Sequence, residues 1–406
     1  MGEKVILAYS GGLDTSVILK WLENKGYDVI AVVVDLGQHE DFDSLEEKAL
    51  GSGAKKLVIR DVRKEFIKEF TFPALQFNAK YEGRYLLGTS LARPVIAREL
   101  IRIAREEGST IIAHGATGKG NDQVRFELSA SALMPEVQVI APWRDAEFNS
   151  IIKGRKEAIE YAEEHGIPVK ATVSQPWSSD ENLMHISFES GILEDPLCPP
   201  KKEMFELTTA PEDAPDSKTC LTIGFKQGLP VSIDGKKTGP VELVEALNII
   251  GGENGIGRID IVENRFVGMK SRGVYETPGF TILHEAHRDI EGLTLTGSVI
   301  NLKDTLMPRF AALVYNGFWF SQEIEVLLSF LSESQRYVEG EVNLELYKGN
   351  VTVTGRKSPF SLYDEKIASM EDDQGAYDQS DAEGFIRLNS LQLKAHGRRK
   401  GPTENR

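Results

Sequence analysis

The chain has little cysteine and no long hydrophobic run. Its 406 residues include only Cys198 and Cys220, which lie far apart and outside any C-x-x-C spacing. A disulfide framework, a zinc site and thiol chemistry are therefore not expected. No apolar run approaches the roughly 18 residues of a membrane span, and no charged-then-apolar signal segment opens the sequence. We expect an intracellular, cytoplasmic protein with no membrane partner.

Basic residues are scarce relative to acidic ones. Lys and Arg number 47 against 62 Asp and Glu, which gives a net charge of −15. No basic stripe stands out before the last few residues. Because nucleic-acid binding depends on positive charge, we expect no nucleic-acid partner. The length exceeds that of one typical core and predicts two domains or more.

Strand-like and helix-like segments alternate in the first part of the chain. The strand-like runs are rich in Val and Ile without polar alternation, which is typical of strands buried on both faces. We therefore predict an α/β fold with a doubly wound parallel sheet and ligands at the carboxyl ends of its strands. Pro94 is expected in the first turn of a helix over 94–107, after a polar string at a domain edge. The expected strands cover 5–8, 28–35, 56–59, 110–113 and 137–140, and the expected helices cover 42–50, 60–70, 122–133 and 153–165.

The alternation ends near residue 170, and a mixed α+β segment follows. We expect hairpins over 224–234 and around Gly349-Asn350, helices over 240–250 and 305–331, and a strand over 258–262. The predicted domains are 1–168 for nucleotide binding, 169–365 for catalysis and multimerisation, and 366–406 for a linker and a C-terminal helix.

The C-terminal region begins with an acidic stretch over 371–381 and continues with a capping box at 380–383. The helix that follows carries Phe385, Leu388 and Leu391 on one side. An oligomerisation arm is the favoured interpretation because this apolar side has little of its own domain to pack on. A helix folded back on its own subunit is the alternative.

The most informative motif is Ser10-Gly11-Gly12-Leu13-Asp14-Thr15-Ser16, between an apolar strand and a helix. Two glycines allow an anion close to the backbone, and the N–H groups of the helix start point at it. The spacing differs from a Walker A loop, and no lysine occurs before Lys20. Two glycines alone would suggest an ordinary tight turn. The full string resembles the PP-loop of ATP pyrophosphatases, which split ATP between the α- and β-phosphates.

Three further strings carry polar groups that could form a binding site. The first, 114–126, is rich in glycine and places Asp122 and Arg125 on one helical face. A glycine-rich turn with a surface ion pair is its alternative interpretation. The second, 176–187, interleaves polar residues with Trp and Met. The third runs over 258–265 and on to 270–276. Each of the last two alone would more often be structural, and His185 would more often be a packing residue.

Together these strings resemble the argininosuccinate synthase family over essentially the whole chain. Residues 8–16, 85–94 and 114–127 match the family's motifs without a gap. The resemblance implies that ATP adenylates the ureido oxygen of citrulline, with release of pyrophosphate, and that the amine of aspartate then displaces AMP. It implies Mg²⁺ carried on ATP, no protein-bound metal, and a homotetramer.

The same resemblance implies the site residues. It implies that ATP is bound by Ala8, Tyr9, Ser10, Gly11, Gly12, Leu13, Asp14, Thr15, Ser16, Val34 and Gly115. It implies that citrulline is bound by Tyr85, Ser90, Asn121, Arg125, Ser178, Ser187, Glu263 and Tyr275. It implies that aspartate is bound by Thr117, Asn121 and Asp122. Position 34 is often alanine in the family, and Val34 suits a contact made through the backbone. Asp14, Asp122 and Arg125 are the predicted catalytic residues.

The chemistry of these residue types agrees with that assignment. Nucleotidyl transfer needs positioning and charge neutralisation, which a glycine loop and Mg²⁺ on ATP supply. Citrulline is a zwitterion, for which Arg125 and Glu263 are suitable partners. Asp122 is expected to take or hold the proton of the aspartate amine. Because a carboxylate of ordinary pKa is a weak base, orientation of the amine alone is one alternative, and a helix cap is the other.

The sequence lacks the residues that related PP-loop functions would need. A tRNA-thiolating PP-loop enzyme would need working cysteines and a basic surface, and a glutaminase-coupled relative would need a nucleophilic cysteine, often at position 2, which is Gly2 here. A nucleotide sensor without turnover would lack the substrate strings at 176–187 and 263–275.

Overall fold

The computed structural model describes residues 2–167, 177–371 and 375–400. Two compact units make up the chain, Met1–Phe360 and Ser361–Arg406, and each is considered by itself. The predicted boundary at 168/169, Pro176 of the second polar string and residues 372–374 of the acidic stretch lie outside the described residues. Within the described part, no helix has the length and apolar character needed to cross a membrane.

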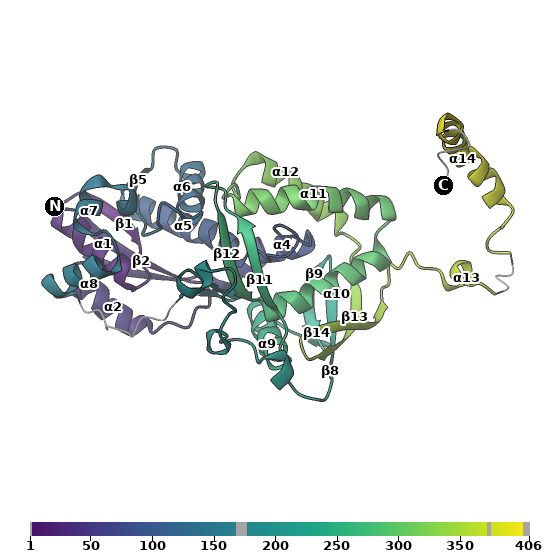
Figure 1. The fold of residues 1–406 in the computed structure, drawn as a ribbon, viewed down its shortest axis with the longest axis horizontal. Coiled ribbons are helices and arrows are strands. Elements are labelled where there is room, and N and C mark those ends of the chain that lie inside the picture. Colours follow the sequence, from purple (N-terminus) through teal and green to yellow (C-terminus); the bar gives the residue numbers. More distant parts are fainter. Residues whose placement is uncertain (1, 168–176, 372–374, 401–406) are drawn as a thin grey trace. The chain divides into compact units, whose positions relative to one another are not determined.

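The N-terminal part is a five-stranded parallel sheet in the order β3-β2-β1-β4-β5 (Figure 1), which confirms the doubly wound prediction. β1 is central, and its two neighbours lead to opposite edges. The carboxyl end of β1 is therefore the topological switch point, where ligands bind in this architecture. The strands are β1 Lys4–Ala8, β2 Asp28–Asp35, β3 Lys56–Asp61, β4 Ile111–Ala113 and β5 Gln138–Ile140.

Helices cover both faces of this sheet. Successive residues of β1 enter different cores: Val5 and Leu7 belong to one apolar cluster, and Ile6 belongs to the other. This burial on both faces explains why the strands show no polar alternation. The helical elements are α1 Leu13–Asn24, α2 Phe42–Gly51, α3 Arg63–Glu65, the π-helix Phe66–Thr71, α4 Phe72–Gln76, α5 Gly88–Glu107, α6 Asp122–Leu133, the 3-10 turn Pro142–Arg144, α7 Ala146–Ile151 and α8 Arg155–Glu164.

One helix start was predicted wrongly, and one short helix was not predicted. α5 begins at Gly88, so the prediction that Pro94 opens a helix is wrong, and this proline lies inside α5. An internal proline costs about 3 kcal/mol. The first turns of α5 are nevertheless deeply buried, with Leu91 and Ala92 at 0% exposure, so tertiary burial outweighs that cost. The helix expected over 153–165 is α8, and the shorter α7 before it was not predicted.

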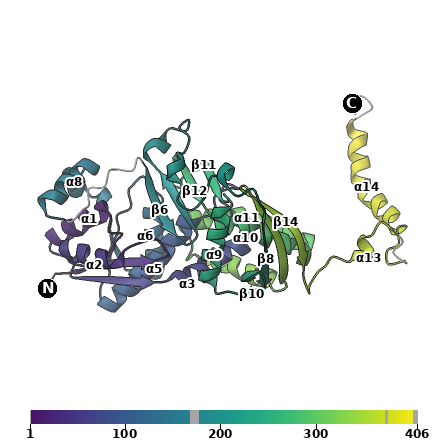
Figure 2. The same cartoon turned by 90° about the horizontal axis from the view of Figure 1, so that it is seen from below.

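The second part of the first unit contains two antiparallel sheets. One has the order β11-β12-β7-β6 and packs against α5, and its strands β6, β11 and β12 lie in the middle of Figure 2. The other has the order β10-β9-β8-β13-β14. The strands of the two sheets are β6 Ser178–Asn182, β7 His185–Glu189, β8 Thr219–Lys226, β9 Leu229–Ile233, β10 Lys236–Lys237, β11 Arg258–Asn264, β12 Lys270–Glu276, β13 Gly340–Tyr347 and β14 Asn350–Lys357. The helices are α9 Pro240–Glu253, α10 Pro278–Thr294, α11 Gly297–Tyr315 and α12 Gln322–Ser334, with 3-10 turns at Gly191–Glu194, Lys202–Met204 and Pro211–Asp213.

The two hairpin predictions are confirmed by the β8–β9 and β13–β14 pairs. At the tip of the second hairpin, Lys348 and Gly349 both have positive φ, as a two-residue hairpin turn requires. α11 begins at Gly297, before the predicted residue 305, and α10 was not predicted. The fold class, a parallel α/β sheet followed by a mixed α+β region, agrees with the prediction.

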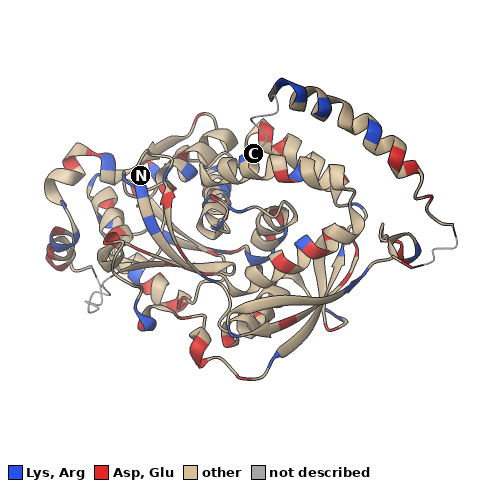
Figure 3. Cartoon of the chain, turned by 45° about the vertical axis from the view of Figure 1, so that its right-hand side comes forward, with Lys and Arg blue, Asp and Glu red and all other residues tan. Residues whose placement is uncertain are grey.

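The second unit contains α13 Glu365–Ala368 and α14 Asp381–Lys400. α14 starts where the capping box predicts. Acidic residues occupy its first turn and basic residues gather near its end (Figure 3), an order that complements the helix dipole. Phe385 and Leu388 are each 70% exposed and Leu391 is 59% exposed, so the predicted apolar side is open.

Candidate active site

The predicted phosphate loop lies at the carboxyl end of the central strand β1. The chain leaves β1 at Ala8, and α1 begins at Leu13 with Gly12 as its N-cap. The first N–H groups of a helix have no intrahelical acceptor, so this end can bind an anion. Gly11 has φ of +69°, and an added Cβ would lie 2.0 Å from a methyl carbon of Leu45. Gly11 is therefore the position at which the fold requires glycine.

Hydroxyl groups hold the loop in shape. The Ser10 and Thr15 hydroxyl oxygens are 3.1 Å apart, and the Thr15 hydroxyl also donates to the Gly12 carbonyl at 3.3 Å. The hydroxyls of Tyr9 and Ser16 form a buried pair at 3.1 Å. These bonds make the loop rigid before any ligand arrives, which lowers the entropy lost on binding.

Two predicted nucleotide residues have distinct surroundings. Desolvation raises the pKa of Asp14, and Arg155 opposes that shift. Val34 is 6% exposed at the end of β2, and its carbonyl accepts a 3.0 Å hydrogen bond from Gln38. The Val34 side chain packs in the core, so a nucleotide could contact only its backbone.

Gly115 connects the loop to a second region. It follows β4, the strand next to β1, and a Cβ at this position would lie 3.2 Å from the Thr15 side chain. Gly115 also lines a cavity of about 680 Å³, a size usual for small-molecule sites. The phosphate loop and the cavity are therefore neighbours.

The cavity brings together most of the residues predicted for citrulline and aspartate. They come from the segment before α5, the loop into α6, the β6–β7 hairpin and the β11–β12 pair. Ser90 does not line the cavity, because it is completely buried in α5. The predicted residues in the cavity wall are Tyr85, Gly115, Thr117, Asn121, Asp122, Arg125, Ser178, Ser187, Glu263 and Tyr275.

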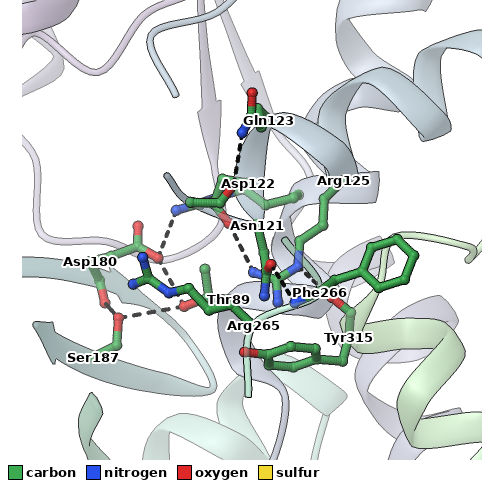
Figure 4. A network of polar contacts seen from close by, with 12 residues as sticks. Thr89, Asn121, Asp122, Gln123, Arg125, Asp180, Ser187, Arg265, Phe266 and Tyr315 are labelled. Atoms are coloured by element: carbon green, nitrogen blue, oxygen red, sulfur yellow. Dashed lines mark hydrogen bonds and ion pairs between the residues drawn. The ribbon is translucent and has the colours of Figure 1, made fainter. Parts of the chain in front are cut away.

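Asp122 is held between two arginines. Its Oδ1 accepts from Arg125 Nη1 at 2.9 Å (Figure 4). Its Oδ2 accepts from Arg93 Nε, also at 2.9 Å. Burial would raise the pKa of Asp122, but the two guanidinium groups lower it below its ordinary value. The Arg125 side chain is 6% exposed, so the alternative of a surface ion pair is wrong. The N-cap of α6 is Asn121, so Asp122 is not the cap.

Glu263 forms an anionic site in the same cavity, and Tyr315 contacts both this carboxylate and Arg125. Its oxygens accept hydrogen bonds from the hydroxyl of Tyr315 at 2.6 Å and from that of Tyr275 at 3.2 Å. Burial raises the pKa of Glu263, which Tyr315 and Arg125 oppose. The guanidinium of Arg125 lies 4.8 Å above the Tyr315 ring. A buried carboxylate next to a buried cation suits a zwitterionic amino acid.

The β6–β7 hairpin presents one polar face. In its register Ser178 pairs with Glu189 and Asp180 pairs with Ser187, and directly paired residues share a face. Thr89 connects this face to α5, because its hydroxyl lies 3.1 Å from Asp180 Oδ2 and 3.4 Å from Ser187 Oγ. All five residues line the cavity.

His185 lies further along the same face, next to the β6–β7 turn, as a buried packing residue. It is 1% exposed, and its ring is parallel to that of Tyr275 with centroids 5.9 Å apart. Burial lowers the pKa of His185 to about 4, so the imidazole is neutral. Its Nε2 lies 3.0 Å from the Thr89 hydroxyl.

Several cavity residues were not assigned from the sequence. Arg93 bridges Asp122 and Asp180, since its Nη2 also donates to Asp180 Oδ2 at 2.9 Å. Arg93 and Asp180 stand within the quoted strings, but only the fold shows that they meet. Tyr315, at the end of α11, carries no local signal at all. The unassigned residues with a polar role in the wall are Thr89, Arg93, Asp180, Glu189, Arg265 and Tyr315.

Asn121 has one amide atom in use and one without a partner. Its Oδ1 accepts from the Phe266 backbone N–H at 2.9 Å. Its Nδ2 is buried and has no hydrogen-bond acceptor among the described residues. A buried donor without an acceptor is costly, which makes Nδ2 a candidate ligand contact. Within the described residues, no group of three or more His, Cys, Asp or Glu side chains is arranged to hold a metal ion.

Comparison with protein families covers nearly the whole chain. A family model described as "Arginosuccinate synthase N-terminal HUP domain" matches residues 4–168. A second, described as "Arginosuccinate synthase C-terminal domain", matches residues 177–396.

Individual relatives agree with these matches. The argininosuccinate synthase of Thermotoga maritima is 55% identical over 401 residues, covering 98% of each chain. That of Danio rerio is 56% identical over 402 residues, covering 98% of this chain and 97% of the relative. That of Syntrophus aciditrophicus is 53% identical over 399 residues, covering 98% of this chain and 99% of the relative.

Proposed function

Because the chain belongs to the argininosuccinate synthase family, it is an ATP-using citrulline–aspartate ligase of arginine biosynthesis, and we propose that the phosphate loop and the cavity are the two halves of its active site. ATP binds at the loop and the two amino acids bind in the cavity. The close approach of Gly115 to Thr15 is the observation that supports this assignment, because an ATP bound at the loop would then have its α-phosphate next to the cavity.

In this proposal the loop holds ATP mainly through its backbone. Residues 8–16 surround the phosphates, Gly115 lies beside them, and Val34 contacts the adenine side through its backbone. Mg²⁺ arrives on ATP, where it neutralises phosphate charge. Asp14 offers a carboxylate in the first turn of α1, and carboxylate with phosphate oxygens is a donor set that Mg²⁺ accepts.

Citrulline binds between the two walls of the cavity. Arg125 takes its carboxylate and Glu263 its ammonium group, while Tyr85, Asn121, Ser178, Ser187 and Tyr275 supply polar contacts. Ser90, which was also predicted for citrulline, is buried in α5, and its hydroxyl has no hydrogen-bond partner among the described residues. The ureido oxygen attacks the α-phosphorus of ATP, pyrophosphate leaves, and a citrullyl-AMP intermediate forms. The protein's contribution to this step is positioning and electrostatic stabilisation.

Aspartate binds at Thr117, Asn121 and Asp122, next to the Gly115 loop. The free Nδ2 of Asn121 is suited to an aspartate carboxylate oxygen. Asp122 orients the aspartate nitrogen toward the activated carbon. Its two guanidinium partners keep it ionised, which favours this orienting role over that of proton acceptor.

Measurement of pyrophosphate release tests the division into two halves. Citrulline with ATP should allow isotope exchange between pyrophosphate and ATP without aspartate, and aspartate should then be required for net argininosuccinate formation. Absence of citrulline-dependent exchange in the folded wild-type enzyme would contradict an adenylated intermediate.

The domain division at 1–168, 169–365 and 366–406, a cytoplasmic location and a homotetramer belong to the same proposal. The exposed apolar side of α14 supports an oligomerisation arm. Sedimentation of the triple variant Phe385→Ser, Leu388→Ser, Leu391→Ser tests this, with Arg387→Ala on the same helix as control. Tetramers in the triple variant would contradict the arm.

A further inference from the structure

A second cavity lies in the first unit, and the proposed reaction makes no use of it. Its volume is about 290 Å³, near the lower limit of small-molecule sites, and it shares no lining residue with the larger cavity. Its walls come from the segment between α4 and α5, the start of β11, helix α10 and the β13–β14 turn. Its charged or titratable lining residues are Lys80, Arg84, Arg258, His284 and Glu285.

Positive charge predominates in this second cavity, although the chain as a whole is acidic. Three cations, Lys80, Arg84 and Arg258, line it together with one carboxylate, Glu285. None of these four side chains forms an ion pair with another described residue. Cations gathered without a counter-charge repel one another, so an anion is attracted to this place.

Arg258 is held in place with one nitrogen left over. Its Nε donates to Thr208 Oγ1 at 2.7 Å, and its Nη2 donates to the Thr208 carbonyl at 2.6 Å. The guanidinium carbon lies 3.8 Å from the centroid of the Phe205 ring. Nη1 has no acceptor among the described residues. Burial lowers the pKa of Arg258, which Glu276 and other carboxylates oppose. A guanidinium that burial disfavours gains stability from a bound anion.

His284 supplies a hydrogen-bonding group that the protein itself leaves unused. It is 3% exposed, and its Nδ1 is buried without a hydrogen-bond partner. Its Nε2 likewise bonds to no described residue. Burial, with Lys80 adding to it, lowers the pKa of His284 well below its ordinary value, so the imidazole is neutral and carries one N–H. An unpartnered polar group in a cavity wall is costly unless a molecule in the cavity bonds to it.

We propose that the second cavity binds a small polyanion through its carboxylate or phosphate oxygens. Lys80, Arg84 and Nη1 of Arg258 hold these oxygens, and one oxygen accepts the N–H of His284. Carboxylates and phosphates are the anions that guanidinium and ammonium groups bind best. The small volume favours such an ion over a nucleotide. The excess of positive charge in the wall favours a ligand with two or more negative charges.

Calorimetric titration tests the proposal, with inorganic phosphate and tricarballylate, a tricarboxylate, as separate probes. ATP and aspartate are kept saturating, so that the phosphate loop and the aspartate contacts are occupied, and citrulline is omitted so that no reaction occurs. We expect one site per chain for at least one probe. The probe that binds more tightly then identifies the ligand as a phosphate or as a carboxylate. Absence of binding by both probes would overturn the proposal.

Variants of the wall locate the bound anion. Lys80→Gln and Arg84→Gln should each weaken binding by about 10-fold or more, the effect of losing a hydrogen bond from a charged group. Lys68→Gln is the matched control, because Lys68 is exposed and lines neither cavity. Glu285→Gln should instead tighten binding, since it removes a repelling carboxylate, and a destabilised variant would not give this gain. Unchanged affinity in both Lys80→Gln and Arg84→Gln would place the anion elsewhere and overturn the proposal.

His284→Leu separates ligand binding from packing. The imidazole bonds to no described residue, so an apolar side chain of similar size should not lower the melting temperature. The affinity for the polyanion should nevertheless fall by about 10-fold, because one hydrogen bond to the ligand is lost. A lower melting temperature with wild-type affinity would show that His284 serves packing alone, and would contradict the proposed site.

Discussion

The phosphate loop and the amino-acid cavity are built in different ways. The loop comes from nine consecutive residues, 8–16, and the groups proposed to bind there are mostly backbone N–H groups of a helix start. The cavity comes from segments as distant as Tyr85 and Tyr315, and the groups proposed to bind there are side chains. A backbone site depends on conformation, whereas a side-chain site depends on packing across the whole fold. The two should therefore respond differently to substitution.

The largest effect is expected from substitution of the loop glycines, which separates conformation from access. Gly12 has φ of −70°, and an added Cβ would meet only the Ser10 hydroxyl, at 3.4 Å. Gly12→Val should therefore leave the melting temperature unchanged while weakening ATP binding by about 100-fold, because the side chain blocks the phosphates. Gly11→Val should weaken ATP binding as much and also lower the melting temperature. The valine would have to adopt the positive φ of Gly11, and its side chain would clash with Leu45.

An ATP titration and a melting curve on the same preparations decide this. Wild-type ATP affinity in Gly12→Val would remove the loop from the nucleotide site. Equal melting temperatures for the two variants would contradict the distinction between them.

Asp122→Asn should affect only the aspartate half of the reaction. We expect argininosuccinate formation to fall by about 100-fold, because the orienting carboxylate is lost, while citrulline-dependent exchange is largely kept. The measurement is exchange and synthesis side by side, with a melting curve, because the change leaves Arg93 and Arg125 without a shared carboxylate. Equal loss in both steps would refute the aspartate assignment.

A third polar cluster lies outside both sites and tests whether a buried ion pair contributes to stability without taking part in the reaction. Glu291 and Lys303 are fully buried and paired, and Gln335 and Asn78 donate to Glu291 at 2.7 and 2.6 Å. Glu291→Gln leaves an unpaired buried cation and should lower the free energy of unfolding by about 3 kcal/mol or more. Substrate affinities should not change, because none of the four lines the cavity.

The pH dependence of that cluster has a definite sign. Burial lowers the pKa of Lys303 to about 8, with Glu291 opposing the shift. Between this pKa and the ordinary value of 10.5, the unfolded chain binds the proton and the folded chain does not. The Lys303 contribution to stability should therefore rise with pH across that window, measurable by denaturant unfolding. Disappearance of this rise in Lys303→Met would verify its source.

The smallest effect is expected from the cysteines. Neither Cys198 nor Cys220 lines the cavity or belongs to the phosphate loop. The double variant Cys198→Ser, Cys220→Ser should keep near-normal turnover. Loss of most activity in a folded double variant would show that a thiol takes part in the reaction.

The sequence by itself determined the parallel sheet, the phosphate loop and the two hairpins. Each depends on neighbours along the chain: uninterrupted Val and Ile runs for strands covered on both faces, and two glycines for close approach of an anion. The second hairpin was predicted around Gly349-Asn350, and its turn lies one residue earlier, at Lys348-Gly349. The start of α5 was predicted wrongly because a local rule for Pro94 was overruled by burial of the residues before it.

Only the tertiary structure decided which charged side chains meet in the cavity. Arg93 and Asp180 stand within recognisable strings, but their contacts follow from which charges meet across α5, α6 and the β6–β7 hairpin. The pKa of a carboxylate depends on burial and on charges within a few ångströms, and neither can be read from the spacing of residues along the chain. For that reason the sequence favoured Asp122 as a base, whereas the fold holds it as an ion between two arginines.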